Sequence, residues 1–376
     1  MRLKTGHVWV YRSDVLSADA IPAASLVTIT DQRGKPLGTA LYSSTSQIAI
    51  RLISPDPIAD FPALLRERIG NAIDYRKSLV RNTDAYRLIF SEADFLPGLI
   101  VDRYHDVLSL QVLTQGMDAN PVRETVISTL AEHLHPTSMV ERTDPRVREL
   151  ESLAPRPSAL LYGQKTATTF TMNGVRFQFD ALQGQKTGAF LDQRENYAAA
   201  ASYAKGEALD VFCYQGGFAL HLAPHCSQVT GVDSSRPALE VADQNATLNG
   251  REIEWIEANA FDLLKDYSSA KRQYDTIVLD PPAFAKTKRD LDAAIRGYKE
   301  LNLRALKMLR PGGILVTCTC SYHVDQTTFR EMLGAASLDA RRTVRLIEMR
   351  GQAKDHPVLL NIPETAYLKC AIVHVS

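Results

Sequence analysis

The sequence has no excess of charge of either sign, because 43 lysine and arginine residues are balanced by 43 aspartate and glutamate residues. A neutral chain does not bind nucleic acid by overall attraction, so such contacts must come from local basic clusters. The sequence also lacks any apolar run near the ~18 residues of a membrane span. Residues 1–10 lack the apolar region of a signal peptide. We therefore expect no membrane partner.

Cysteine is scarce: the chain has five, an odd number without the spacing of a disulfide framework. This usage is typical of a reducing compartment, so we expect a cytoplasmic protein. The cysteines form no metal-binding pattern, and we expect no metal. Internal repeats and low-complexity segments are also absent, and 45% apolar with 23% charged residues is a globular composition.

The chain of 376 residues is longer than a domain with a single hydrophobic core usually is, which indicates several domains. Residues 1–72 have short strand-like runs and a helical run at 62–70, which predict a small β-barrel. Residues 73–183 mix helical and strand-like runs and predict an α+β domain. The expected strands of these two regions are 8–11, 26–30, 38–42, 48–52, 85–91, 99–102, 107–113, 138–142 and 175–179, and the further helices are 72–81 and 122–134.

From residue 184 onward, strands and helices alternate, which predicts a doubly wound and mostly parallel α/β sheet. Ser235 is a candidate N-cap, Pro237 lies in the first turn of the helix that follows, and Gly250 is its stop signal. The expected strands are 208–212, 228–233, 253–258, 276–279 and 313–318, with closing strands at 343–348 and 367–375. The expected helices are 218–224, 236–249, 290–309 and 326–335.

A strand that runs into a glycine turn, residues 210–218 (DVFCYQGGF), indicates a nucleotide-like pocket. Only Gly216 and Gly217 are present, so the G-x-G-x-x-G fingerprint of dinucleotide-binding enzymes is missing and an NAD oxidoreductase is disfavoured. Asp233 ends the next strand, where an acid commonly binds ribose hydroxyls, and Asn259 follows the third strand, where it could meet an adenine edge. This pattern favours S-adenosylmethionine over NAD. The alternative to a ligand pocket is that Gly216 and Gly217 only form a tight turn between strand and helix, and that Asp233 caps a helix.

Two further strands end on reactive side chains: 276–284 (TIVLDPPAF) on Asp280 and 313–321 (GILVTCTCS) on two thiols. In an open parallel sheet, ligands bind beyond the carboxyl ends of the strands. Prolines pin the backbone after Asp280, so its carboxylate could hold the edge of a base. Cys320 lies beyond Cys318 along the strand and is better placed to attack carbon 6 of a cytosine. Cys318 is expected to pack in the interior.

Several stretches resemble the class I methyltransferases that make 5-methylcytosine in 23S ribosomal RNA and carry an N-terminal PUA domain. Residues 6–11 (GHVWVY) and 46–51 (SQIAIR) are similar to PUA segments of that family. Residues 87–94 (RLIFSEAD) and 97–104 (PGLIVDRY) resemble its central domain. Residues 186–196 (KTGAFLDQREN) and 296–302 (RGYKELN) resemble its methyltransferase domain.

The resemblance covers nearly the whole chain and implies a PUA-like RNA-binding domain (1–72), a central α+β domain (73–183) and a Rossmann-like S-adenosylmethionine-dependent methyltransferase domain (184–376). It implies Cys320 as the nucleophile, and the strand ends predict a catalytic role for Asp280, which would hydrogen-bond the ring edge and stabilise the adduct. Together with the strand ends, it gives the candidate cofactor-binding residues Asp192, Arg194, Asp210, Tyr214, Gly216, Gly217, Asp233, Ser234, Asn259, Ala260 and Asp280.

The expected partner is ribosomal RNA, in a single-stranded or loop region, because the target base must leave its stack. Lys286, Lys288 and Arg289 form the candidate RNA-binding cluster, with a solvated loop as the alternative. Two other functions stay open. One is an rRNA guanine N2-methyltransferase, which needs no cysteine, and the other is a noncatalytic RNA-binding protein with a methyltransferase fold. Whether the chain acts alone or as a homodimer is also open.

Overall fold

The computed structural model describes residues 2–18, 20–182, 189–285 and 287–376. The chain divides into two compact units. One comprises residues 1–170, 179–188 and 354–365, and the other comprises 171–178, 189–353 and 366–376. Among the described residues, no helix combines the length and the apolarity needed to cross a membrane.

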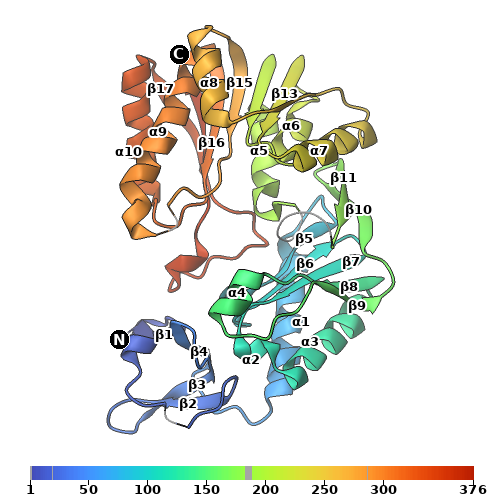
Figure 1. The fold of residues 1–376 in the computed structure, drawn as a ribbon, viewed down its shortest axis with the longest axis vertical. Helices are drawn as coiled ribbons and strands as arrows, with labels where there is room; N and C mark the ends of the chain where they lie inside the picture. The colour runs from blue at the N-terminus through green and yellow to red at the C-terminus, as the bar shows by residue number, and fades with distance from the viewer. Residues whose placement is uncertain (1, 19, 183–188, 286) are drawn as a thin grey trace. The chain divides into compact units, whose positions relative to one another are not determined.

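The first unit opens with a four-stranded antiparallel sheet in the order β1-β4-β3-β2 (Figure 1). Its strands are β1 (Trp9–Tyr11), β2 (Leu26–Thr30), β3 (Pro36–Tyr42) and β4 (Ile48–Ser54), with short 3-10 helices at Arg2–Thr5 and Arg12–Asp14. All four strands agree with the predicted positions to within two residues at each end. Its small core is formed by Ile29, Ala40, Tyr42, Ala49 and Ile50.

A single helix, α1 (Phe61–Leu79), follows the first sheet. The prediction of separate helices at 62–70 and 72–81 was wrong, because the helix passes through Gly70 without a break. Leu65, Ile69 and Ile73 are fully buried on one face of α1, and this packing outweighs the cost of about 1 kcal/mol for a helical glycine. Residue 72, the predicted domain limit, therefore lies inside a helix.

A five-stranded sheet in the order β5-β6-β7-β8-β9 completes the first unit, with α1 and α3 in contact beside it. The strands are β5 (Ala85–Phe90), β6 (Leu99–Tyr104), β7 (Val107–Val112), β8 (Ser138–Glu141) and β9 (Ala159–Gly163). The helices are α2 (Gln115–Asp118), α3 (Asn120–Leu134) and α4 (Pro145–Leu150), with 3-10 turns at Ser91–Asp94 and Pro363–Thr365.

The second unit contains a seven-stranded sheet in the order β14-β13-β12-β15-β16-β18-β17. The first five strands are parallel to one another, β18 runs antiparallel to β16, and the edge strand β17 runs antiparallel to β18. This topology confirms the predicted Rossmann-like sheet. The strands are β12 (Glu207–Val211), β13 (Gln228–Asp233), β14 (Glu254–Glu257), β15 (Tyr274–Leu279), β16 (Leu309–Thr319), β17 (Val344–Arg350) and β18 (Lys369–Val375).

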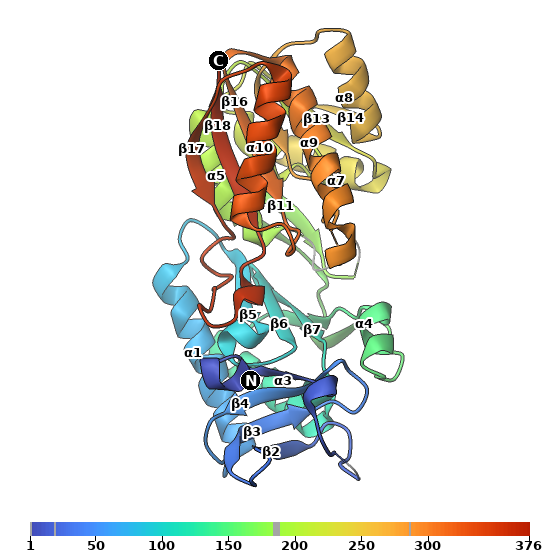
Figure 2. The same ribbon diagram turned by 90° about the vertical axis from the view of Figure 1, so that its left-hand side faces the viewer.

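Helices cover this sheet, and Figure 2 shows α9 and α10 beside one another. Ser235 caps α7 by accepting a hydrogen bond of 3.4 Å from the Ala238 amide, as predicted. The helices α5 and α8 were not predicted. A hairpin precedes them, and of its two strands β11 (Val175–Asp180) was predicted and β10 (Ala167–Met172) was not. The helices are α5 (Arg194–Tyr203), α6 (Gly217–Leu222), α7 (Arg236–Leu248), α8 (Ala260–Ser269), α9 (Leu291–Met308) and α10 (Gln326–Ala340), with 3-10 turns at Leu191–Gln193 and Lys288–Asp290.

Candidate functional site

The carboxyl ends of β12, β13, β15 and β16 carry most of the predicted site residues. The turn after β12 is tight: Gly216 has a φ of +85°, in the left-handed region that glycine tolerates best. A Cβ atom on Gly216 would lie 2.9 Å from the Trp255 ring, and one on Gly217 would lie 2.5 Å from the Tyr197 hydroxyl. Both glycines are therefore required by close packing around the turn.

Asp210 lies on β12, fully buried beneath this turn. Its Oδ2 accepts a hydrogen bond of 2.8 Å from the Ala219 amide at the start of α6. Its Oδ1 is also buried and has no hydrogen-bond partner among the described residues. Burial, reinforced by the charges of Asp280 and Asp233, raises the pKa of Asp210 to about 8 and outweighs the opposing hydrogen bond.

Asp233 ends β13 and joins it to the turn after β12. Its Oδ2 accepts a hydrogen bond of 2.9 Å from the Tyr214 amide, and its Oδ1 accepts one of 2.9 Å from the Ser235 amide. The carboxylate is thus oriented by backbone groups, and each oxygen keeps a second lone pair for a ligand hydroxyl. Ser234 lies exposed beside it.

Asn259 caps α8, because its Oδ1 accepts hydrogen bonds from the Phe261 amide at 2.9 Å and the Asp262 amide at 3.3 Å. The side chain is exposed, and the next residue, Ala260, is buried at the start of the helix. The oxygen of the amide group is therefore used by the helix, which leaves the Nδ2 group as the part that can donate to a ligand.

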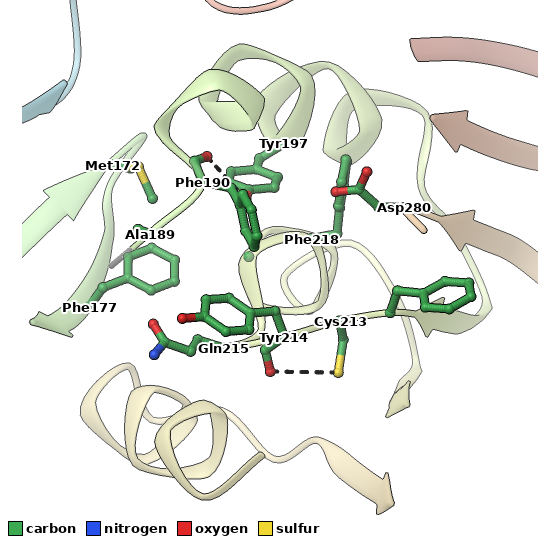
Figure 3. Close-up of a pocket in the computed structure, with 12 residues that line it drawn as sticks. Met172, Phe177, Ala189, Phe190, Tyr197, Cys213, Tyr214, Gln215, Phe218 and Asp280 are labelled. Carbon is green, nitrogen blue, oxygen red and sulfur yellow. Dashed lines mark hydrogen bonds between the residues drawn. The ribbon is translucent and has the colours of Figure 1, made fainter. Parts of the chain in front are cut away.

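A pocket containing about 390 Å³ of unfilled space, part of it open to solvent, lies next to the glycine turn (Figure 3). Three segments of the second unit supply its aromatic wall: residues 171–178 of the β10–β11 hairpin, the residues around α5, and the turn after β12. Figure 3 shows Phe177 and Asp280 toward opposite ends of this pocket. The lining residues are Met172, Phe177, Ala189, Phe190, Tyr197, Phe212, Cys213, Tyr214, Gln215, Gly217, Phe218 and Asp280.

Asp280 follows β15 and accepts a hydrogen bond of 2.9 Å at Oδ1 from Gln193 Nε2. Withdrawal of the carboxyl from bulk water, together with the negative charge of Asp192, raises the pKa of Asp280 to about 7. The hydrogen bond from Gln193 acts in the opposite direction. Near neutral pH this side chain can thus act either as a donor or as an acceptor.

The two thiols at the end of β16 have different surroundings. Cys318 is fully buried opposite Cys370 of β18, and burial raises the pKa of its thiol well above the ordinary value. Gln193 contacts it from the 3-10 turn before α5. Cys320 lies one residue beyond the strand and is partly exposed. Of the two thiols, only that of Cys320 is partly accessible to solvent.

Asp192 and Arg194 flank Gln193 at the start of α5. The Tyr367 hydroxyl donates a hydrogen bond of 2.6 Å to Asp192 Oδ2. Arg194 is only 1% exposed, and its guanidinium lies 3.7 Å from the Glu195 carboxylate. Residues 186–188 of the motif that contains these side chains lie outside the described part of the chain.

The predicted basic cluster is described in part, because Lys286 lies outside the described residues. Lys288 and Arg289 are exposed in the short 3-10 turn before α9. Thr287 and Asp290 form a capping box around this turn. The residues that line the pocket come from other segments, so the described members of the cluster form a separate surface feature.

Sequence reasoning missed several residues that the fold brings to this site. Met172 and Phe177 reach the pocket from the β10–β11 hairpin, and Cys213, to which no role in the site was assigned, lies in its wall. Gln193 lies within the motif at 186–196 but had no predicted role. Only its position directly between Asp192 and Arg194 could have drawn attention to it.

Comparisons with known proteins agree with this arrangement. Residues 158–346 match a family of S-adenosylmethionine-dependent methyltransferases, and residues 1–55 match a PUA-like domain. The ribosomal RNA large subunit methyltransferase I of Shewanella denitrificans is 38% identical over 99% of this chain and 96% of the relative. The protein of the same name from Tolumonas auensis is 39% identical over 98% of this chain and 95% of the relative.

Solved structures with low sequence identity share the fold. A methyltransferase crystallised with SAH superposes with a TM-score of 0.85 at 21% identity, covering 99% of this chain and 97% of that one. An S-adenosylmethionine-dependent methyltransferase from Streptococcus mutans superposes with a TM-score of 0.84 at 20% identity, covering 99% and 96%.

Proposed function

The chain belongs to the family of S-adenosylmethionine-dependent methyltransferases that contains the ribosomal RNA large subunit methyltransferases I, and we propose that it methylates carbon 5 of a cytosine in large-subunit ribosomal RNA. The observation that carries the choice of base is the partly exposed thiol of Cys320 beyond β16. The parallel neighbour strand β15 delivers Asp280 to the same edge of the sheet. A guanine N2-methyltransferase has no use for such a thiol.

The described residues suit the cofactor. Bound S-adenosylmethionine supplies the methyl group on a positively charged sulfur. Asp233, already oriented by two amides, would accept hydrogen bonds from its ribose hydroxyls. The unpartnered Oδ1 of Asp210 marks a place where a polar group of the ligand would form a hydrogen bond with a buried oxygen. We assign the remaining contacts to Asp192, Arg194, Tyr214, Gly216, Gly217, Ser234, Asn259, Ala260 and Asp280.

In the proposed reaction, the Cys320 thiolate forms a bond to carbon 6 of the cytosine, and the electron pair of the 5,6 double bond moves toward carbon 5. Carbon 5 would then take the methyl group that bound S-adenosylmethionine supplies, with the electron pair of the broken carbon–sulfur bond left on sulfur. Loss of the carbon-5 proton restores the double bond and expels the Cys320 thiolate. Asp280 in its carboxylate form would accept a hydrogen bond from the cytosine amino group and hold the ring.

We assign RNA docking to the PUA-like region (1–72) together with Lys286, Lys288 and Arg289. The central region (73–183) would connect it to the catalytic region (184–376). A single-stranded or loop segment suits the reaction, because carbon 6 is accessible only after the base leaves its stack. The low net charge indicates specific rather than tight general binding.

Transfer of tritium from labelled S-adenosylmethionine into ribosomal RNA tests this function. Cys320→Ala is expected to abolish transfer, and Cys318→Ala, the matched control two residues earlier, is expected to keep most of it. RNA containing 5-fluorocytosine should trap a covalent complex with the wild-type protein but not with Cys320→Ala. Labelling of guanine would favour the N2-methyltransferase, and failure to bind the cofactor would favour a noncatalytic RNA-binding protein.

A further inference from the structure

A buried lysine lies beside the end of β16. Lys369 starts β18, pairs in register with Thr319, and is only 8% exposed. Its Nζ donates one hydrogen bond of 2.8 Å to the Ser321 carbonyl and another of 2.8 Å to the Tyr367 carbonyl. An ammonium group has three N–H donors, so these two carbonyls hold the cation in place and leave one donor for a third partner.

The backbone around Cys320 is held on both sides. The Ser321 amide donates a hydrogen bond of 3.2 Å to Thr319 Oγ1. Ser321 Oγ accepts one of 3.1 Å from the Ala285 amide and lies 2.9 Å from the Tyr298 hydroxyl. Thr319 and Ser321 are both fully buried, whereas Cys320 between them is partly exposed. The thiol is therefore carried by a short, well-anchored segment next to a fixed cation.

Charge interactions link the cation to this segment. Burial lowers the pKa of Lys369 to about 8, and the negative charges of Cys320 and Asp325 act in the opposite direction. Tyr298, which faces the same segment from α9, has a raised pKa and stays neutral at physiological pH. Lys369 thus remains cationic at pH 7. The attraction is mutual, so the ammonium that gains from a thiolate also stabilises that thiolate.

We propose that Lys369 is a positioning residue that keeps the side chain of Cys320 in its thiolate form. The thiol proton leaves to solvent, the negative charge stays on Sγ, and the Lys369 ammonium balances it without changing its own protonation. This role deepens the proposed function, because the thiolate is the form that attacks carbon 6. Lys369 itself forms no covalent bond.

The test is the pH dependence of alkylation at Cys320 by iodoacetamide, followed by mass spectrometry of the peptide that contains it. Neither RNA nor cofactor is present. Lys369→Met should move the midpoint to higher pH by about one unit or more, and slow alkylation at pH 7 about tenfold. Lys369→Arg should keep the wild-type midpoint to within about half a unit. Lys307→Met, an exposed lysine of α9, is the control and should change nothing.

An unchanged midpoint in Lys369→Met, or an equal shift in the control, would overturn the proposal. If Lys369→Met does not fold, Lys369→Gln gives the same comparison with a polar side chain. The two hypotheses fail separately. If Cys320→Ala keeps methyl transfer while Lys369→Met shifts the alkylation midpoint, the nucleophile is wrong and the cation–thiolate pair stands. If instead Cys320→Ala abolishes methyl transfer while Lys369→Met leaves the alkylation midpoint unchanged, the role of Lys369 is wrong and Cys320 stands as the nucleophile.

Discussion

Gln193 donates a hydrogen bond of 2.9 Å from Nε2 to Oδ1 of Asp280. The direction of the Gln193 amide is set by Asn196, whose Nδ2 donates a hydrogen bond of 2.7 Å to Gln193 Oε1. Asn196 Oδ1 in turn accepts a hydrogen bond of 2.9 Å from Arg350 on β17. Because each amide group uses its oxygen and its nitrogen on different partners, the chain of bonds orients the Asp280 carboxyl from outside the pocket.

Gln193→Glu should change the pH dependence of methyl transfer. The substitution removes the hydrogen-bond donor to Asp280 and adds a carboxylate beside it. The negative charge of Asp192 already raises the pKa of Asp280, so the added charge should raise it further, above about 7. Since the carboxylate form is proposed to hold the base, the rate at pH 7 should fall about tenfold and recover at higher pH. Initial rates from pH 6 to 9.5 measure this. Gln326→Glu, exposed at the start of α10, should keep the wild-type profile.

Asp210→Asn should flatten the dependence of stability on pH. The pKa of Asp210 is raised to about 8, so the folded chain holds this proton more tightly than the unfolded chain. The stability that comes from this tighter proton binding is fully present below the pKa of Asp210 in the unfolded chain, about 4. It is lost as the pH rises from there through the folded pKa of about 8. Asparagine cannot ionise. Between pH 5 and pH 8 the wild type should therefore lose at least about 1 kcal/mol more unfolding free energy than the variant.

Urea unfolding at the two pH values measures the difference for Asp210→Asn. Asp243→Asn, on the exposed face of α7, serves as the control and should behave as the wild type. Equal losses in the wild type and Asp210→Asn would contradict the raised pKa.

Gly217→Ala should destabilise the second unit. The new methyl group would lie 2.5 Å from the Tyr197 hydroxyl, and Tyr197 is buried in the pocket wall. We expect a loss of about 1–3 kcal/mol and weaker cofactor binding, measured by thermal unfolding and calorimetry. Gly334→Ala in α10 has nothing within 4 Å of the added atom and should stabilise by about 0.5–1 kcal/mol. If Gly217→Ala leaves the stability unchanged, the turn accommodates the added methyl group and the predicted clash is wrong.

The double variant Lys288→Ala with Arg289→Ala should weaken RNA binding. Both side chains are exposed, and if each one neutralises a phosphate, its removal should reduce the slope of log affinity against log salt by about one. Fluorescence anisotropy over a salt series gives this slope. Lys265→Ala with Lys307→Ala removes the same charge from exposed positions on α8 and α9. If both double variants reduce the slope equally, the cluster has no special part in docking.

Local pattern predicted most of the strands, because hydrophobic alternation and turn residues act over a few neighbours, but it missed β9 and β10. The β13 prediction matches its observed bounds, and Ser235 caps α7 as expected. The prediction went wrong at Gly70, which was taken as the end of a helix. Whether a helical glycine is tolerated depends on what the neighbouring turns bury, and α1 buries residues on both sides of it.

The sequence by itself determined that acids and thiols stand at the ends of successive strands, because the order of residues along a strand decides which of them emerges at its carboxyl edge. Only the tertiary structure decided which distant groups meet them. Gln193 reaches Asp280 across 87 positions, and Lys369 reaches the Ser321 carbonyl across 48. Such pairings depend on the order of strands in the sheet, which brings β18 beside β16, and on the packing of the turn before α5.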